Sequence, residues 1–219
     1  GLTETAPVLT AERPDKRKAG SVGVPLDNVE IRIDNPDENG IGEVIAKGDN
    51  IMHGYYDNEE ATAAVLRDGW FHTGDLGYID KSGYLFLSGR KKNVIVLKNG
   101  KNVFPEELET EISTLPYQME NIVVGLPKNG DDRDPVVALK IVYDPEQFAG
   151  MSKEEIEKRI HEDVEKINDR MPLYKRIKRI FVTDEPMIKT STSKVRRFLE
   201  IEKMLEEENK DGGTHGKQI

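Results

Sequence analysis

Two short segments carry residue types that suit nucleotide chemistry. Asp75 ends the run Trp70-Phe71-His72-Thr73-Gly74-Asp75, and Arg90 follows fifteen residues later in Gly89-Arg90. An aspartate carboxylate can accept hydrogen bonds from both vicinal hydroxyls of a ribose, and an arginine can supply charge-assisted donors to ribose or phosphate oxygens. Gly-Asp and Gly-Arg are also common turns, in which Asp75 would cap the turn and Arg90 would be solvated. These two segments alone leave both interpretations open.

The residues around Asp75 and Arg90 read as short strands separated by turns. Apolar and polar residues alternate in Val29-Glu30-Ile31-Arg32-Ile33, and compact apolar runs occupy Val44-Ile45-Ala46 and Tyr84-Leu85-Phe86-Leu87. One short helix is expected around residues 59–66. The pattern predicts a small β-barrel or sandwich over the first ninety residues.

Helices and strands are mixed after the basic cluster Arg90-Lys91-Lys92. Asn99-Gly100 predicts a hairpin turn, Pro105 suits a first helical position, and Ser152 with Glu155 forms a capping box. The expected strands are 122–124, 136–143 and 177–183, and the expected helices are 105–115, the segment between Ser152 and Pro172, and 197–208. The fold class is therefore α+β, with a boundary at 90–92 between domains 1–90 and 91–208 and a disordered tail at 209–219.

Composition limits the function classes. The 219 residues are 36% apolar and 33% charged, which is enough for a core, and the net charge of −9 argues against a nucleic-acid partner. No apolar run approaches the roughly 20 residues of a membrane span and no export signal is present, so a cytoplasmic protein is expected, with peripheral membrane contact left open. The absence of cysteine excludes disulfides and thiolate metal sites. The missing initial methionine hints at a fragment.

Five motifs stand in order along the chain. They are Gly-Leu-Thr-Glu-Thr at residue 1, Gly-Trp-Phe-His-Thr-Gly-Asp at 69, Gly-Arg-Lys-Lys-Asn-Val-Ile-Val at 89, Gly-Lys-Asn-Val-Phe-Pro-Glu-Glu-Leu-Glu at 100 and Lys-Thr-Ser-Thr-Ser-Lys-Val-Arg-Arg at 189. In this combination the chain resembles the adenylate-forming (AMP-binding) superfamily. The resemblance implies that residues 1–90 are the β-barrel-like end of a large AMP-binding domain and that residues 91–208 are a small mobile lid domain.

The resemblance also implies a nucleotide site. Thr3 would contact the adenylate phosphate and Glu4 would help hold Mg²⁺, which commonly binds through one or two carboxylates and nucleotide phosphates. Asp75 would bind the ribose hydroxyls, and Arg90 would contact the ribose. Without the resemblance, Thr3 and Glu4 would read as an ordinary loop.

Lys194 is implied to be catalytic. Attack of a carboxylate on the α-phosphate brings two negative groups together, and an ammonium group between them can contribute about 3 to 4 kcal/mol of stabilisation. On the sequence alone, Lys194 would be a solvated lysine before the last helix. The family usually has Gly directly before this lysine, whereas this chain has Ser193. We therefore expect a different turn there, or a less close approach to the nucleotide.

Lys92 matches the family's hinge, where rotation of the small domain switches the enzyme from adenylation to thioester formation. After that switch, Lys98, Asn99 and Gly100 would line the pantetheine tunnel for coenzyme A. A plain Asn-Gly hairpin turn is an equal alternative for this segment.

The implied activity is that of an acid–thiol ligase. ATP and a fatty acid would give an acyl-adenylate, and coenzyme A would then displace AMP; the segment from Arg90 to Gly100 looks most like that of long-chain fatty acid ligases. The chain is expected to be inactive alone, because nothing in it resembles the family's phosphate loop. An amino- or aryl-acid adenylation domain and a non-catalytic nucleotide-binding module are the alternatives. The basic clusters lack the interleaved aromatics of a nucleic-acid module.

Overall fold

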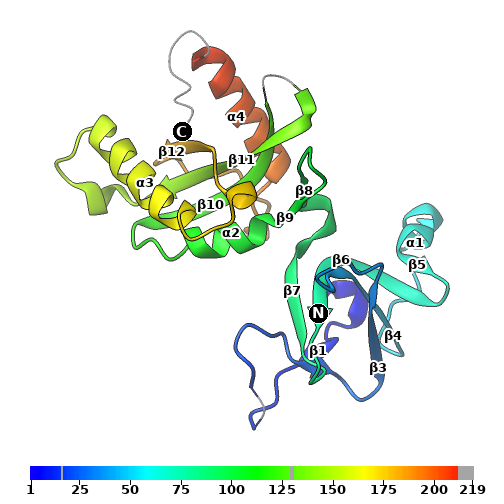
Figure 1. Ribbon diagram of the computed structural model, residues 1–219. Helices are drawn as coiled ribbons and strands as arrows, with labels where there is room; N and C mark the ends of the chain where they lie inside the picture. The colour runs from blue at the N-terminus through cyan, green and yellow to red at the C-terminus, as the bar shows by residue number, and fades with distance from the viewer. Residues whose placement is uncertain (16, 129–130, 212–219) are drawn as a thin grey trace. The chain divides into compact units, whose positions relative to one another are not determined.

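The computed structural model describes residues 1–15, 17–128 and 131–211. The chain forms two compact units, the first spanning Gly1–Lys92 and the second beginning at Asn93 (Figure 1). Within the described residues, no helix has both the length and the apolar composition needed to cross a membrane.

The first unit is built on an open five-stranded sheet. Its strands run in the order β3-β4-β6-β5, with β7 also paired to β6, and the described residues do not close it into a barrel. The bounds are β3 (Val29–Asp34), β4 (Gly42–Gly48), β5 (Leu66–Arg67), β6 (Trp70–Ile79) and β7 (Leu85–Arg90). The smaller elements are η1 (Thr3–Thr5), β1 (Thr10–Ala11), β2 (Val24–Pro25) and α1 (Glu59–Val65).

Alternation in β3 produces the core of this unit. Val29 and Ile31 are buried, while Glu30 and Arg32 between them are exposed, because successive side chains of a strand point to opposite faces. The buried face packs with Val44 and other apolar residues from neighbouring strands. This sheet positions Asp75 on β6 and Arg90 on β7.

The second unit is a three-stranded sheet with helices on both faces. The strands run in the order β10-β11-β12, with β10 and β11 antiparallel and β11 and β12 parallel. Its elements are β8 (Ile95–Val96), β9 (Asn102–Val103), α2 (Pro105–Ile112), β10 (Gln118–Lys128), β11 (Asp131–Tyr143), η3 (Pro145–Phe148), α3 (Lys153–Asn168), η4 (Leu173–Lys175), β12 (Arg179–Thr183) and α4 (Arg197–Asp211), and η2 (Lys91–Asn93) connects the units.

Strand β11 divides the core of the second unit. Val137, Leu139 and Ile141 pack into one cluster with residues of α2 and α3, whereas Ala138 and Val142 join another with Met204 and neighbouring residues of α4. The α4 ribbon accordingly lies on the opposite side of the strands from α3 (Figure 1). Both faces of β11 are therefore covered.

The expected α+β class is confirmed, and the strand-rich part is an open sheet rather than a barrel. The capping box at Ser152 begins α3 as expected. Helix α2 ends at Ile112, before the expected Leu115, where the Ser113 and Thr114 hydroxyls bond back to helix carbonyls. Helix α4 continues to Asp211, and residues 212–219 of the expected tail lie outside the described residues.

Candidate nucleotide site and carboxyl-terminal unit

Asp75 and Arg90 are brought together by strand pairing. They are directly opposite each other on β6 and β7, and Arg90 Nε lies 2.7 Å from Asp75 Oδ1. The Asp75 side chain is 18% exposed and the Arg90 side chain 42% exposed. A carboxylate and a guanidinium are thus held side by side at the surface of the first unit, within reach of solvent.

Asp75 follows an irregularity in the pairing of β6 with β4, and the Thr73 side chain fixes this segment. The Thr73 hydroxyl donates to the Val44 carbonyl at 2.7 Å and accepts from the Asp75 N–H at 3.0 Å. Arg90 Nη1 donates to the Thr73 carbonyl at 3.2 Å. Gly74 has φ +71°, a conformation that L side chains rarely adopt, so the irregularity in β6 depends on this glycine. The backbone therefore holds Asp75 in one orientation.

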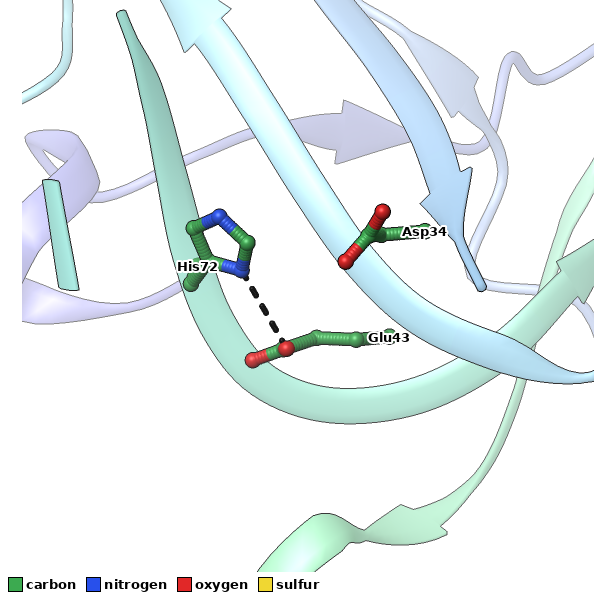
Figure 2. Close-up of side chains that lie close together, drawn as sticks. All are labelled: Asp34, Glu43 and His72. Atoms are coloured by element: carbon green, nitrogen blue, oxygen red, sulfur yellow. Dashed lines mark hydrogen bonds and ion pairs between the residues drawn. The ribbon is translucent and has the colours of Figure 1, made fainter. Parts of the chain in front are cut away.

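Glu43 contacts this segment of β6 and accepts from three donors. Its Oε1 accepts from the Gly74 N–H at 3.2 Å, while its Oε2 lies 2.9 Å from Lys91 Nζ and 3.2 Å from His72 Nδ1. Figure 2 shows the Glu43 and His72 side chains facing each other, with Asp34 beside them. Burial raises the pKa of Glu43, but the hydrogen bonds from Lys91 and His72 outweigh it and leave that pKa below its ordinary value of 4.5.

Asp34, Glu43 and His72 also have the composition of a metal site. One ligand atom from each lies within 4.8 Å of the others (Figure 2). However, Glu43 Oε2 is already 2.9 Å from the Lys91 ammonium, which neutralises the carboxylate that a cation would need. We therefore interpret Glu43, His72 and Lys91 as a structural network, beside which Asp34 lies.

Thr3 and Glu4 lie on η1 in the first unit. The Tyr55 hydroxyl donates to Glu4 Oε1 at 3.0 Å, and the Met52 N–H donates to the Glu4 carbonyl at 2.9 Å. Burial, then the hydrogen bond and charge of Glu4, raise the pKa of Tyr55. Glu4 Oε2 accepts no hydrogen bond from the described residues. Thr3 is exposed.

Lys194 ends a tight hairpin of the second unit. An isolated bridge pairs Lys189 with Val195, the Thr190 N–H donates to the Lys194 carbonyl at 2.8 Å, and the Ser193 N–H donates to the Thr190 carbonyl at 3.0 Å. The Lys194 side chain is exposed and has no ion pair among the described residues. Its ammonium group is thus presented to solvent from an ordered turn.

Two acidic side chains hold the base of this hairpin. Glu200 on α4 accepts from the Ile188 N–H at 2.7 Å, and Glu120 on β10 accepts from the Met187 N–H at 3.2 Å. Glu200 is fully buried and pairs with Lys140 at 2.8 Å. The backbone that leads to Lys194 is therefore fixed by groups of the core.

Lys98, Asn99 and Gly100 form the tip of the β8–β9 hairpin. The Gly100 N–H donates to the Leu97 carbonyl at 2.8 Å, and Gly100 has φ +77° with open space where a Cβ would be. Lys98 and Asn99 line a hollow of about 200 Å³. The other basic residues that line this hollow are Lys128, Arg176 and Lys178.

Family models match residues in both units. The AMP-binding enzyme family model matches residues 1–56, and the model of the AMP-binding enzyme C-terminal domain matches residues 92–210, more than half of the chain. The chain belongs to the AMP-binding enzyme family.

Its relatives include ligases of different acids. The chain is 38% identical over 150 residues to long-chain-fatty-acid–CoA ligase FadD15 of Mycobacterium bovis, covering 68% of this chain and 23% of the relative. It is 40% identical over 132 residues to indoleacetate–CoA ligase of Aromatoleum aromaticum, covering 57% and 26%. The chain thus spans about a quarter of the length of these relatives.

A solved AMP-binding enzyme has the same fold. The O-succinylbenzoate coenzyme A synthetase of Bacillus subtilis, in complex with ATP and magnesium, aligns with a TM-score of 0.73 and 30% identity. The alignment covers 90% of this chain and 39% of that one.

The sequence interpretation missed Glu43, Tyr55 and Lys91, which support the residues that it selected. A signal for Glu43 was available, because an acidic residue directly precedes the apolar run Val44-Ile45-Ala46 and a charge beside a buried strand needs a partner. The partners themselves are 29 and 48 residues away, and no local pattern predicts them.

Proposed function

We propose that this AMP-binding enzyme chain is the carboxyl-terminal part of an ATP-dependent acid–thiol ligase. In the first step, an acid carboxylate attacks the α-phosphorus of ATP, a P–O bond forms and pyrophosphate leaves. In the second step, the thiol of coenzyme A loses its proton and attacks the acyl carbon, so that the thioester forms and AMP leaves. Because the reaction consumes ATP and coenzyme A, we place the enzyme in the cytoplasm.

The ion pair between Asp75 and Arg90 is the observation that carries this proposal. Two residues fifteen positions apart are held at 2.7 Å on paired strands, and Asp75 directly follows the glycine-dependent irregularity in β6. In the ligase, the Asp75 carboxylate accepts hydrogen bonds from the ribose hydroxyls, and Arg90 both orients that carboxylate and donates to the ribose. Preorganisation by Thr73 and Glu43 lowers the entropic cost of binding.

Thr3 and Glu4 contact the phosphate end of the nucleotide in this proposal. Glu4 fits a magnesium site, because it offers a hard carboxylate oxygen and the Tyr55 hydroxyl fixes its orientation at 3.0 Å. The ion, when bound, supplies charge neutralisation of the phosphates. The Thr3 hydroxyl donates a hydrogen bond to a phosphate oxygen.

Lys194 acts in adenylation only. Its exposed ammonium group reduces the repulsion between the acid carboxylate and the α-phosphate, and the ordered hairpin beneath it limits the conformations that it must give up. Rotation of the second unit about Lys92 then removes Lys194 from the reacting groups and brings the β8–β9 hairpin to them.

The β8–β9 hairpin binds coenzyme A. Gly100 leaves room for the pantetheine chain to approach the backbone. The hollow beside Lys98 and Asn99 is lined by three further basic residues and by one acidic residue, Asp134, which suits the phosphates of the coenzyme.

A fatty acid is the substrate that we favour, because the alignment with a long-chain fatty acid ligase covers 68% of the chain. Indoleacetate and other aryl acids are the competing class, since the indoleacetate ligase is 40% identical over a shorter segment. Acyl-CoA formation by the full-length enzyme with a panel of fatty and aryl acids separates them. Nucleotide binding without a thioester from any acid would favour the non-catalytic module.

The nucleotide site is tested by Asp75→Ala in the full-length enzyme. Loss of hydrogen bonds to a charged group should weaken AMP and ATP binding by about 10- to 100-fold in calorimetric titration. Asp49→Ala is the matched control, because Asp49 is exposed and has no partner among the described residues. Unchanged affinity in Asp75→Ala would remove this site from the proposal.

A further inference from the structure

The connection between the two units is anchored on both sides of a single residue. Lys91, Lys92 and Asn93 form the short 3₁₀ turn η2. Lys91 belongs to the first unit, and its ammonium group lies 2.9 Å from Glu43 Oε2. Asn93 belongs to the second unit, and its amide Nδ2 donates to Glu106 Oε1 at 2.7 Å. Lys92, between them, is exposed, and its side chain has no partner among the described residues.

The anchor of the first unit joins a buried carboxylate, Glu43, to the Lys91 side chain, which is 61% exposed. Glu43 is 6% exposed and is held by His72 and the Gly74 N–H as well as by Lys91 (Figure 2). A buried carboxylate without its cation is costly, so release of Lys91 is opposed. Directly before Lys91, Arg90 is fixed by its pairing with Asp75.

The anchor of the second unit is the hydrogen bond from Asn93 to Glu106. Glu106 stands in the first turn of α2, where the helix dipole favours a negative group. Its Oε2 is buried and accepts no hydrogen bond from the described residues, so Asn93 supplies the partner that the structure gives this carboxylate. Two residues after Asn93, Ile95 is 4% exposed in the core of the unit.

We propose that Lys91 and Asn93 are positioning residues that confine bending of the connection to Lys92. This inference rests on the proposed ligase function, which requires the second unit to take two orientations. Bending at one residue gives two defined orientations, because the backbone on each side is held to its own unit. Bending over several residues would spread the second unit over many orientations, of which few are productive.

The test uses proline at the hinge as a background. In the full-length enzyme, Lys92→Pro fixes φ near −65° and should lower single-turnover thioester formation from supplied acyl-adenylate by about 100-fold. If bending is confined to Lys92 by its neighbours, releasing a neighbour lets another residue bend. Lys91→Met and Asn93→Ala should therefore each restore thioester formation in the Lys92→Pro background by about tenfold. Lys81→Met is the matched control, because Lys81 is an exposed lysine of the same unit without a partner among the described residues.

Failure of the inference is distinguishable from failure of the function. Pyrophosphate exchange is measured in the same samples: exchange in the wild type supports the ligase, and its absence with every acid overturns the proposed function. Where pyrophosphate exchange is present, two results overturn the inference. One is that neither Lys91→Met nor Asn93→Ala restores thioester formation in the Lys92→Pro background; the other is that Lys81→Met restores it equally well. Amide hydrogen exchange of residues 89–95 gives a readout that does not depend on activity, and it should increase in Lys91→Met but not in Lys81→Met.

Discussion

At the scale of residues, Ser193 has a left-handed backbone conformation that Gly adopts more readily than Ser. The sequence led us to expect a different turn there, because the family usually has Gly at this place. The structure gives Ser193 φ +61°, in the left-handed region that Gly adopts freely. The hydrogen bonds that close the hairpin at Thr190 hold it there. Ser193 therefore carries local strain in this hairpin.

Ser193→Gly should therefore stabilise the second unit. Relief of the left-handed strain should exceed the added entropy of the unfolded glycine, and we expect a gain of about 0.5 kcal/mol in the free energy of unfolding by urea titration. Ser191→Gly is the control, since Ser191 does not have positive φ. It should cost about 0.5 kcal/mol instead, and equal effects of both substitutions would refute the strain argument.

At the scale of elements, the packing of α4 on β11 holds the base of the Lys194 hairpin. Lys140 stands on β11 between Leu139 and Ile141, and its face of the strand is covered by α4. Glu200 on α4 neutralises it at 2.8 Å and also accepts from the Ile188 N–H. One carboxylate therefore joins the sheet, the helix and the base of the hairpin.

Lys140→Met should destabilise the second unit by about 3 kcal/mol, because it removes the nearer cation from a buried carboxylate and leaves only Lys203, at 4.0 Å. The double variant Lys140→Met/Glu200→Gln should recover part of that loss. Chemical denaturation of the single and double variants measures both. A single variant as stable as the wild type would contradict the account of this pair.

Acid should weaken the same contact. Burial raises the pKa of Glu200, but hydrogen bonds from the Ile188 N–H and Lys140 outweigh it and set that pKa below its ordinary 4.5. The stability that Glu200 contributes is thus complete above pH 4.5 and is lost as the pH falls through the lowered pKa. Glu200→Gln should flatten the dependence of unfolding free energy on pH below 4.5; an unchanged slope would argue against it.

Over the whole molecule, local patterns predicted most of the elements. The alternation in β3, the capping box at Ser152 and the Asn-Gly turn each lie within a few residues of sequence, and each appears where it was expected. The strand-rich part was expected as a β-barrel or sandwich, and it is an open sheet, because the degree of sheet closure depends on strand pairing that no short pattern specifies.

The candidate site was predicted only in part, for the same reason: its motif residues were found, but the residues that support them were not. Motifs selected Asp75 and Arg90, and the strand register then brought them together. Thr73 contacts both of them, while the neighbouring Gly74 N–H is held by Glu43, which pairs with Lys91 48 residues away. Long-range ion pairs leave no periodic signal, so the supporting residues became visible only in the folded chain.

At the scale of the whole molecule, the central claim concerns the two units. It is that Lys194 serves adenylation only, and that the hinge at Lys92 serves the change from adenylation to thioester formation. The most direct measurement is single-turnover kinetics of each half-reaction in the full-length enzyme. Lys194→Ala should reduce acyl-adenylate formation by a factor of hundreds or more, yet still convert supplied acyl-adenylate to acyl-CoA. Lys92→Pro should do the reverse. If both substitutions slowed both halves equally, Lys194 would not be specific to adenylation, and residues 90–92 would be a rigid connection.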